Sequence, residues 1–336
     1  MQRYILRRLL FLVFVIVGTI TLLFTIMYLI PADPAKAAAG LNARPEQVES
    51  IRRELGLDKP VHIQYLTYIR NLLRGNLGIS VLTRKPVMSE LRVYLPASLE
   101  LVLAALLLNV VIAVPLGVFS ALRPGHVADT LSRLFAALGV GMPVFWVGLV
   151  GQLLFYGKLN WLPYGGRLST GLLPPPYVTG FYTVDALLAG DFGLFGDALT
   201  HLILPSAVLA LPQLAVISRL TRSSMLDVLA QDYIRTARAK GLLPSRVVWV
   251  HALKNAFLVP LTMLGMQIGW MLGGTLLVES VFSWGGLGFF AFNGIKQHDF
   301  PVVMGVTLVV CIAFVFSNLI VDILYAYLDP RITYSA

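Results

Sequence analysis

Residue types that catalyse reactions occur in this 336-residue sequence, but not at the spacings that catalysis or metal binding requires. The five histidines are scattered and no two have metal-ligand spacing: His62, His126, His201, His251 and His298. The sequence lacks the Gly-x-x-x-x-Gly-Lys-Ser/Thr phosphate loop, the Gly-x-Ser-x-Gly nucleophile elbow and the His-Glu-x-x-His zinc motif. We therefore expect no catalytic residue, no metal site and no cofactor bound by this chain itself.

Two further features look reactive, and we interpret both as structural. Gly286-Leu-Gly288-Phe-Phe-Ala291 has the spacing of a dinucleotide fingerprint, but it follows an apolar helical segment instead of a strand. The single cysteine, Cys311, lies within a long apolar run and cannot form an intramolecular disulfide. We expect Cys311 to act as a small hydrophobic side chain.

The composition indicates a membrane protein. Hydrophobic residues make up 57% of the chain and charged residues only 13%, about half the usual share for a soluble domain. The net charge of +9 comes without a compact basic block, which argues against a nucleic-acid partner. A helix needs about 20 apolar residues to cross the hydrocarbon core. Six windows without Asp, Glu, Lys or Arg meet or approach that length: Leu9–Ile30, Leu101–Leu122, Leu134–Gly157, Leu202–Ser218, Asn255–Val278 and Phe300–Val321.

These windows predict an all-α, polytopic fold with six transmembrane helices. The fourth is the shortest and contains Pro205 and Pro212, so it is the least certain crossing. The first follows Arg3, Arg7 and Arg8 and could be mistaken for a signal peptide. Its apolar run is 22 residues, longer than the roughly 7–15 of a cleaved signal, and we expect it to be retained.

Charge indicates how the loops alternate across the membrane. With the N-terminus inside, residues 31–100, 158–201 and 279–299 lie outside, whereas 123–133, 219–254 and the tail lie inside. The loop 219–254 carries seven basic residues, as the positive-inside rule expects: Arg219, Arg222, Arg235, Arg238, Lys240, Arg246 and Lys254. Residues 31–100 break the pattern because they carry ten basic residues, but long segments translocate largely regardless of charge.

The first outer segment contains its own helix signals. Pro45–Leu55 reads as a short helix ended by Gly56, and Val61–Leu73 reads as a second helix after Pro60. In the second outer segment, Pro174 to Pro176 predict a stiff extended element.

The inner loop 219–254 predicts an amphipathic helix-turn-helix outside the membrane. On a helical wheel one face is apolar: Leu226, Leu229, Ala230, Tyr233 and Ala237. The helix should end at Lys240-Gly241, and Pro244 permits a second short helix through Val247–Trp249. From physics alone the first helix could dock into a protein groove, lie on the lipid surface, or belong to a plain loop.

This loop also resembles a known family. The stretch Asp232–Gly241 is similar to the coupling motif of ATP-binding-cassette (ABC) importer permeases, in the dipeptide/oligopeptide/nickel branch. The broad family motif is Glu-Ala-Ala, with a Gly four residues after the last Ala. At these positions this chain has Arg235, Thr236, Ala237 and Gly241. Arg235 and Thr236 depart from the broad motif and match the residues typical of this branch. Other stretches match in order: Arg7–Leu9, Ile30–Pro34, Glu54–Pro60, Gly75–Gly78, Pro96–Leu101, His251–Ala256 leading to Pro260, Phe282–Gly288 and Asp329–Ile332.

The resemblance implies a type I importer transmembrane domain in a bacterial cytoplasmic (inner) membrane. It implies four kinds of partner: the lipid membrane, a sister permease, two cytosolic ATPase subunits that hold ATP and Mg²⁺, and an external solute-binding protein. Residues implied to couple the chain to the ATPase are Leu229, Asp232, Tyr233, Arg235, Thr236, Ala237, Arg238 and Gly241. The implied substrates are short peptides, with nickel complexes, glutathione or another small solute as the alternative.

Two features of the fifth window extend this interpretation. Gly265, Gly269 and Gly273 form overlapping GxxxG units, which favour close helix packing over a substrate role. Glu279 lies near the outer end of the same window, where a carboxylate is less costly than at the bilayer centre. It could line the translocation path or be a hydrated residue at the interface.

Other function classes fit less well. An intramembrane enzyme would need paired catalytic groups within its spans, and a channel or secondary transporter would usually show inverted repeats or several charged residues there. Neither explains the basic inner loop. We expect four parts: a first helix (1–30), an outer segment (31–93), a transport domain (94–325) that contains the loop 219–254, and a cytoplasmic tail (326–336).

Overall fold

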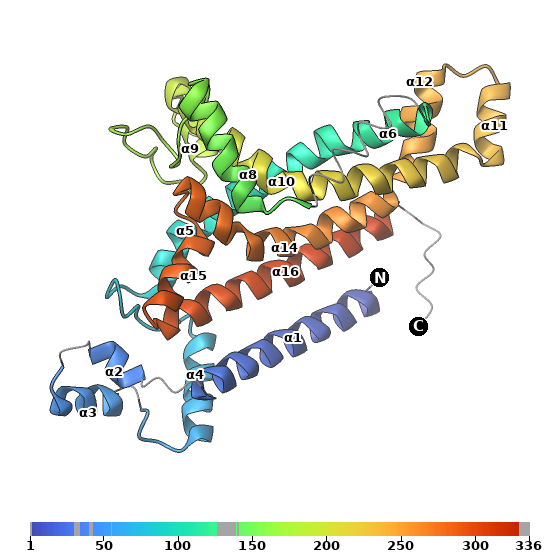
Figure 1. Ribbon diagram of the computed structural model, residues 1–336. Coiled ribbons are helices and arrows are strands. Elements are labelled where there is room, and N and C mark those ends of the chain that lie inside the picture. Colours follow the sequence, from blue (N-terminus) through green and yellow to red (C-terminus); the bar gives the residue numbers. More distant parts are fainter. Residues whose placement is uncertain are drawn as a thin grey trace.

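The computed structural model of the chain is helical, and it describes residues 2–29, 34–39, 43–54, 56–125, 139 and 141–328. The β-structure in these ranges is limited to one isolated bridge between Ile79 and Pro86. Long helices run side by side through the centre, and short helices gather at the two ends of the bundle (Figure 1). The expected all-α fold class is therefore confirmed.

The six predicted windows all fall on apolar helices, but only four of these helices are full-length membrane spans by length and composition within the described residues: Val87–Leu122, Phe192–Leu229, Leu258–Phe282 and Phe300–Ile320. The apolar stretch Leu10–Ile26 is part of the longer helix α1, and Val144–Lys158 is a shorter apolar helix. Part of the third window, 134–138 and 140, lies outside the described residues. The bounds of the central helices are α1 Gln2–Leu29, α5 Val87–Leu108, η1 Asn109–Ala113, α6 Val114–Leu122, α8 Val144–Gly151, η2 Gln152–Lys158, α10 Phe192–Leu229, α14 Leu258–Phe282 and α16 Phe300–Leu328.

The fourth crossing is the longest helix in the described chain, not a short one. α10 runs for 38 residues with Pro205 and Pro212 in its interior, and it continues beyond both ends of the apolar window. At its start the Asp191 side chain accepts a hydrogen bond from Leu194 N at 2.9 Å, which caps the helix among residues that the sequence assigned to a loop. Hydropathy reports only the apolar length of a helix, so it misses such polar extensions.

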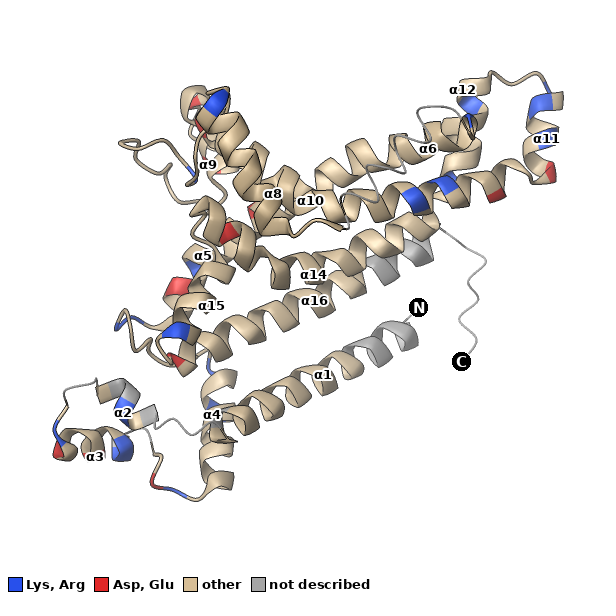
Figure 2. Ribbon diagram, in the orientation of Figure 1, with Lys and Arg blue, Asp and Glu red and all other residues tan. Residues whose placement is uncertain are grey.

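The short helices divide between the two ends of the bundle. At one end lie α2 Pro34–Ala39, α3 Pro45–Glu54, α4 Val61–Leu73, α9 Tyr182–Leu188 and α15 Leu287–Lys296; at the other lie α11 Asp232–Ala239, α12 Pro244–Arg246, η3 Val247–Ala252 and α13 Leu253–Ala256 (Figure 1). The predictions for Pro45–Leu55 and Val61–Leu73 are confirmed, although Leu55 lies outside the described residues. The helices α9 and α15 were not predicted. Charged side chains concentrate at the two ends of the molecule, while the middle lengths of α14 and α16 are uncharged (Figure 2).

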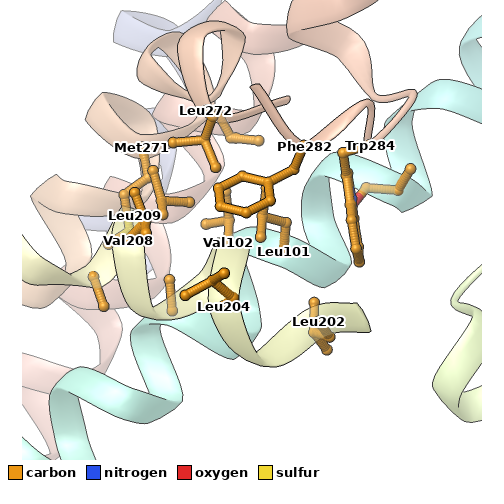
Figure 3. Packing of buried hydrophobic residues seen from close by; sticks show 14 residues of the cluster. Leu101, Val102, Leu202, Leu204, Val208, Leu209, Met271, Leu272, Phe282 and Trp284 are labelled. Atoms are coloured by element: carbon orange, nitrogen blue, oxygen red, sulfur yellow. The ribbon is translucent and has the colours of Figure 1, made fainter. Parts of the chain in front are cut away.

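Three of the four apolar clusters in the described part of the chain follow one another along the bundle. The α9-end core joins α5, α10 and α14 and is closed by Phe282 and Trp284 (Figure 3); it consists of Ala97, Leu101, Val102, Ala105, Leu202, Leu204, Val208, Leu209, Ala210, Met271, Leu272, Val278, Phe282 and Trp284. The mid-helix core consists of Ala113, Val114, Ile217 and Leu264. The α11-end core consists of Val118, Ala121, Met225, Val228, Ile234, Ala237, Val247, Val248, Ala252 and Ala256.

Candidate functional site

The segment between α10 and α14 projects from one end of the bundle as two short arms, α11 and the α12–η3–α13 arm (Figure 1). The chain does not pass from α10 into α11 as one helix. α10 ends at Leu229, and Gln231 adopts an extended conformation with φ −76° and ψ 151° before α11 begins. The prediction of a single amphipathic helix through Ala237 is therefore wrong, because this break changes the direction of the side chains of every residue after Leu229.

The buried face of α11 differs from the predicted one. Ile234 is completely buried and Ala237 is 8% exposed, and both belong to the α11-end core with Val247 and Val248 of η3. Tyr233, which the wheel placed on the apolar face, is 38% exposed, and Ala230 is also exposed. The apolar face of α11 is thus used inside the chain, and it is not free to enter a groove on another protein.

The face that α11 presents outward is polar and charged. Its exposed residues are Asp232, Tyr233, Arg235, Thr236, Arg238, Ala239 and Lys240. Arg235 Nη1 lies 3.4 Å from Asp232 Oδ1, and both side chains are largely exposed. A partner would recognise this face through hydrogen bonds and charge more than through apolar burial.

Tyr233 connects α11 to the second arm. Its hydroxyl accepts a hydrogen bond from Asn255 Nδ2 at 2.8 Å, and the His251 carbonyl lies 3.5 Å from the same hydroxyl. The short helix predicted through Val247–Trp249 is present, as α12 with Pro244 at its first turn followed by the π-helical η3. The ring of Trp249 packs edge-on to Phe119 of α6 at 6.0 Å.

Gly241 closes α11 with the predicted C-terminal turn. Its φ is +74°, a region that favours glycine. Gly241 N donates to Arg238 O at 2.9 Å, and Leu242 N donates to Ala237 O at 3.4 Å, which together form a Schellman motif. No atom lies within 4 Å of the position that a Cβ would take, so the constraint at Gly241 is conformational and not steric.

Glu279 is enclosed at the opposite end of the bundle. The residue is 0% exposed, and its carboxylate accepts hydrogen bonds from Ser98 Oγ and, at 2.8 Å, from Phe289 N. Ser98 Oγ also accepts from Leu287 N at 2.7 Å, so both side chains hold the first turn of α15. The expectation of a hydrated interfacial carboxylate is wrong, and a side chain without exposed surface does not line a path in this conformation.

The three glycines of α14 that form the GxxxG units serve different purposes. A Cβ on Gly269 would lie 1.8 Å from Phe314 Cδ2, so the ring of Phe314 in α16 occupies the space that a side chain would need. A Cβ on Gly273 would meet nothing within 4 Å. Gly265 is buried. Close helix packing is thus required at Gly269 but not at Gly273. Gly273 instead lines, with Gly274, Thr307 and Cys311, a pocket between α14 and α16.

Four buried carboxylates of the described chain were not identified from the sequence: Glu90, Glu100, Asp185 and Asp299. Glu100 pairs with Arg167 at 2.7 Å and accepts from Thr183 N and Oγ1 at 2.9 and 2.7 Å. Asp185 accepts from Thr179 N and Gly180 N, each at 2.8 Å. Asp299, at the start of α16, accepts from Ser80 Oγ at 2.6 Å and Leu82 N at 3.0 Å. The one available signal was a carboxylate directly beside an apolar window, as at Glu100.

Several sequence predictions fall on residues that the structure does not describe. The matched stretches at 30–33 and 329–332 and His126 are outside the described residues, as are the side chains of Arg3, Arg7 and Arg8. Within the described part, no group of three or more His, Cys, Asp or Glu side chains is arranged to hold a metal ion.

Two family models match the chain and together cover nearly all of it. Residues 113–334 match the model described as "Binding-protein-dependent transport system inner membrane component". Residues 1–102 match the N-terminal model of the same kind of membrane component.

Curated relatives match along almost the whole chain. A protein of Escherichia coli (strain K12) named "Probable D,D-dipeptide transport system permease protein DdpB" is 47% identical over 321 residues, which are 96% of this chain and 94% of the relative. The "Dipeptide transport system permease protein DppB" of Alkalihalophilus pseudofirmus is 42% identical over 99% of this chain and 100% of its own. A "Glutathione transport system permease protein GsiC" of Salmonella paratyphi A is 35% identical over 99% of this chain and 100% of the relative.

Proposed function

The chain belongs to the family of binding-protein-dependent transport system inner membrane components, and on that premise we propose that it forms half of the translocation pathway of an ABC importer for short peptides. The choice of short peptides as the substrate rests on the 47% and 42% sequence identity to relatives whose names specify dipeptide transport. The relative named for glutathione transport is less similar, at 35%. Glutathione or another small solute, including nickel complexes, is therefore the second candidate.

We infer four kinds of protein component for the complete importer: this chain, a sister permease, two cytosolic ATPase subunits and an external solute-binding protein. The sequence has no phosphate loop, so ATP and Mg²⁺ would be held by the ATPase subunits. The proposed docking element is α11, which protrudes at the end of the bundle and exposes Asp232, Arg235 and Arg238.

The way α11 is held supports a role in transmitting movement. Ile234 and Ala237 belong to the same apolar core as Met225 and Val228 of α10 and Val247 and Val248 of η3. Since close-packed interiors are stiff, a displacement of α11 by a docked subunit would carry the inner ends of α10 and the α12–η3–α13 arm with it. Leu229 lies at the end of α10 and packs on the same core. Tyr233, through Asn255, would carry movement toward α14.

We propose six crossings, with the N- and C-termini in the cytoplasm and residues 94–325 as the transport domain. α1 begins, and α16 ends, at the end of the bundle that carries α11 (Figure 1), which supports this orientation. The basic residues of 219–254 at the same end support a cytoplasmic location through the positive-inside rule.

Reconstitution tests the proposed function directly. The four components, co-purified and placed in liposomes, should accumulate a radiolabelled dipeptide when ATP is supplied to the ATPase side and the binding protein to the other. Unlabelled dipeptide should compete with this uptake more strongly than glutathione or nickel chelates. Uptake of glutathione with no uptake of dipeptides would contradict the substrate, and accumulation that does not depend on ATP would contradict the importer class.

A further inference from the structure

Two buried amide side chains in the middle of the bundle have no hydrogen-bond partner. Asn109 is 0% exposed and Gln267 is 3% exposed. In the described part of the chain, six buried side-chain nitrogen or oxygen atoms lack a partner, and four of them are the amide atoms of these two residues. Buried amide groups are nearly always hydrogen-bonded, so two unsatisfied amides need an explanation.

The two amides lie at the same depth of the bundle. In the α5–η1–α6 helix, Asn109 lies between Ala105 of the α9-end core and Ala113 of the mid-helix core. In α14, which runs in the opposite direction, Gln267 lies between Met271 of the α9-end core and Leu264 of the mid-helix core. Both amides therefore belong to a layer between these two cores, which we call the amide layer.

The backbone is irregular in the same layer. The π-helical turn η1 begins at Asn109 and interrupts the regular hydrogen bonding of the α5–η1–α6 helix. On α10, Pro212 lies between Ala210 of the α9-end core and Ile217 of the mid-helix core. Proline has no N–H, so the carbonyl of Val208 receives no helical hydrogen bond from it. Three helices run through the amide layer. The α5–η1–α6 helix and α10 are thus weakened at the depth of the amides, and α14 carries Gln267.

On both sides of the amide layer the helices are tightly packed. Toward the α11 end, a Cβ on Gly117 of α6 would lie 2.6 Å from Ser218 O and 2.5 Å from Thr221 Cβ of α10, so these helices are in direct backbone contact. Toward the α9 end, Trp284 is 2% exposed and donates from Nε1 to Ala97 O at 2.8 Å. Two firmly packed halves meet at a layer with interrupted helices and unsatisfied amides.

We propose that the amide layer is a hinge between the two halves, and that Asn109 and Gln267 act as positioning residues that gain hydrogen-bond partners when the halves reorient during transport. In the conformation described here the amides are unpaired, which disfavours this conformation relative to one that satisfies them. Such a movement would let each amide form a hydrogen bond with the free carbonyl of Val208 or with the other amide, since all of these groups belong to the same layer. This inference rests on the proposed function, because an importer must alternate between two conformations.

The test compares the thermal denaturation midpoint (Tm) of the complete complex, in lipid nanodiscs, without nucleotide and with ATP plus vanadate. Gln267→Met and Asn109→Leu remove an amide with little change in volume. We expect each substitution to raise the Tm in the condition that populates the conformation described here and to lower it in the other. ATP-driven uptake should fall about tenfold, as one of the two states is depopulated. Gln267→Asn, which retains an amide, should keep a larger share of the uptake than Gln267→Met.

Gln152→Met is the matched control. Gln152 is 4% exposed, but its Nε2 donates to Tyr164 O at 2.7 Å and to Val281 O at 3.0 Å. Its loss should lower the Tm in both conditions. Shifts of Gln267→Met or Asn109→Leu that have the same sign in both conditions, or no shift in either, would overturn the hinge. A wild-type complex whose Tm does not respond to nucleotide would instead overturn the proposed function.

Discussion

Arg167, in the segment between η2 and α9, forms an ion pair with Glu100 of α5, with Nη2 2.7 Å from Oε2. The two side chains are 9% and 4% exposed, and the same Arg167 nitrogen donates to Gly180 O at 2.8 Å. The guanidinium also lies 3.5 Å from the centroid of the Tyr182 ring. One arginine therefore holds both sides of the loop before α9 against α5.

The substitution Arg167→Met should strongly destabilise the segment between η2 and α9. It leaves Glu100 buried without its countercharge, and breaking a buried pair typically costs about 3–5 kcal/mol. The Tm of the purified complex measures the loss. The double variant Arg167→Met/Glu100→Gln should recover part of it, because the unpaired charge is gone. Arg52→Met is the control, since the Arg52–Glu49 pair of α3 is 33% and 52% exposed and such pairs contribute about 1 kcal/mol or less. Equal losses for Arg167→Met and Arg52→Met would contradict the assignment.

Acidification should loosen the turn before α9. Burial alone raises the pKa of Asp185, but hydrogen bonds from the Thr179 hydroxyl and from the N–H groups of Thr179, Gly180 and Val178 outweigh it and hold the pKa below its ordinary value of 3.8. A lowered folded-state pKa contributes stability that is complete above the unfolded value and is lost as the pH falls through the folded value. The protection factors of residues 178–185 against hydrogen exchange, which correct for the intrinsic effect of pH on exchange, should therefore be high at pH 6 and fall only below about pH 4. Asp185→Asn should have low protection factors at both, and unchanged protection factors in this variant would refute the role of the carboxylate.

Hydrophobic length and turn residues predicted the helix positions well. Gly56 and Pro60 are local signals with local consequences, so α3 ends at Glu54, shortly before Gly56, and α4 begins directly after Pro60. The break at Gln231 could not be predicted in this way. A helical wheel assumes that the helix continues, whereas the actual conformation is decided by packing Ile234 and Ala237 beneath η3.

The carboxylate contacts at the α9 end could not be predicted for a different reason. Glu279 binds Ser98 across 181 positions of sequence, and Glu100 binds Thr183 across 83. The partner of a buried carboxylate depends on which helices pack together, and a single sequence does not contain that information. The sequence did identify Gly241, because its requirement for a positive φ belongs to the local turn.

The glycines of α14 should differ sharply in tolerance to alanine. Gly269→Ala places a methyl group where the Phe314 ring lies, and overpacking of this kind costs about 1–3 kcal/mol. Gly273→Ala meets no atom within 4 Å in this chain and serves as the control on the same helix. The Tm of the complex should fall for Gly269→Ala and recover partly in Gly269→Ala/Phe314→Ala. A larger loss for Gly273→Ala would instead indicate that a partner subunit packs there.

Valine at Gly241 should impair coupling without preventing assembly. A β-branched residue at φ +74° costs about 1–2 kcal/mol and disrupts the turn that fixes α11. We expect ATP hydrolysis by the complex to continue while peptide uptake falls severalfold. Gly190→Val carries the same conformational cost, because Gly190 has φ +71° and ends α9 at the opposite end of the bundle. Loss of coupling in both variants would show that backbone strain alone is responsible.

The substitution Ala237→Asp tests whether coupling needs the buried face of α11. Ala237 is 8% exposed within the α11-end core, so a carboxylate there must either remain desolvated or push α11 away from η3 and α10. The first outcome destabilises the α11-end core, and the second separates the docking helix from the long helix that it is proposed to move. In both cases uptake should fall while ATP hydrolysis persists. Ala239→Asp introduces the same charge on the same helix at an exposed position and should retain most of the uptake. If Ala239→Asp uncoupled the complex and Ala237→Asp did not, movement would be transmitted through the exposed contact alone, and the packing of α11 on α10 would have no part in coupling.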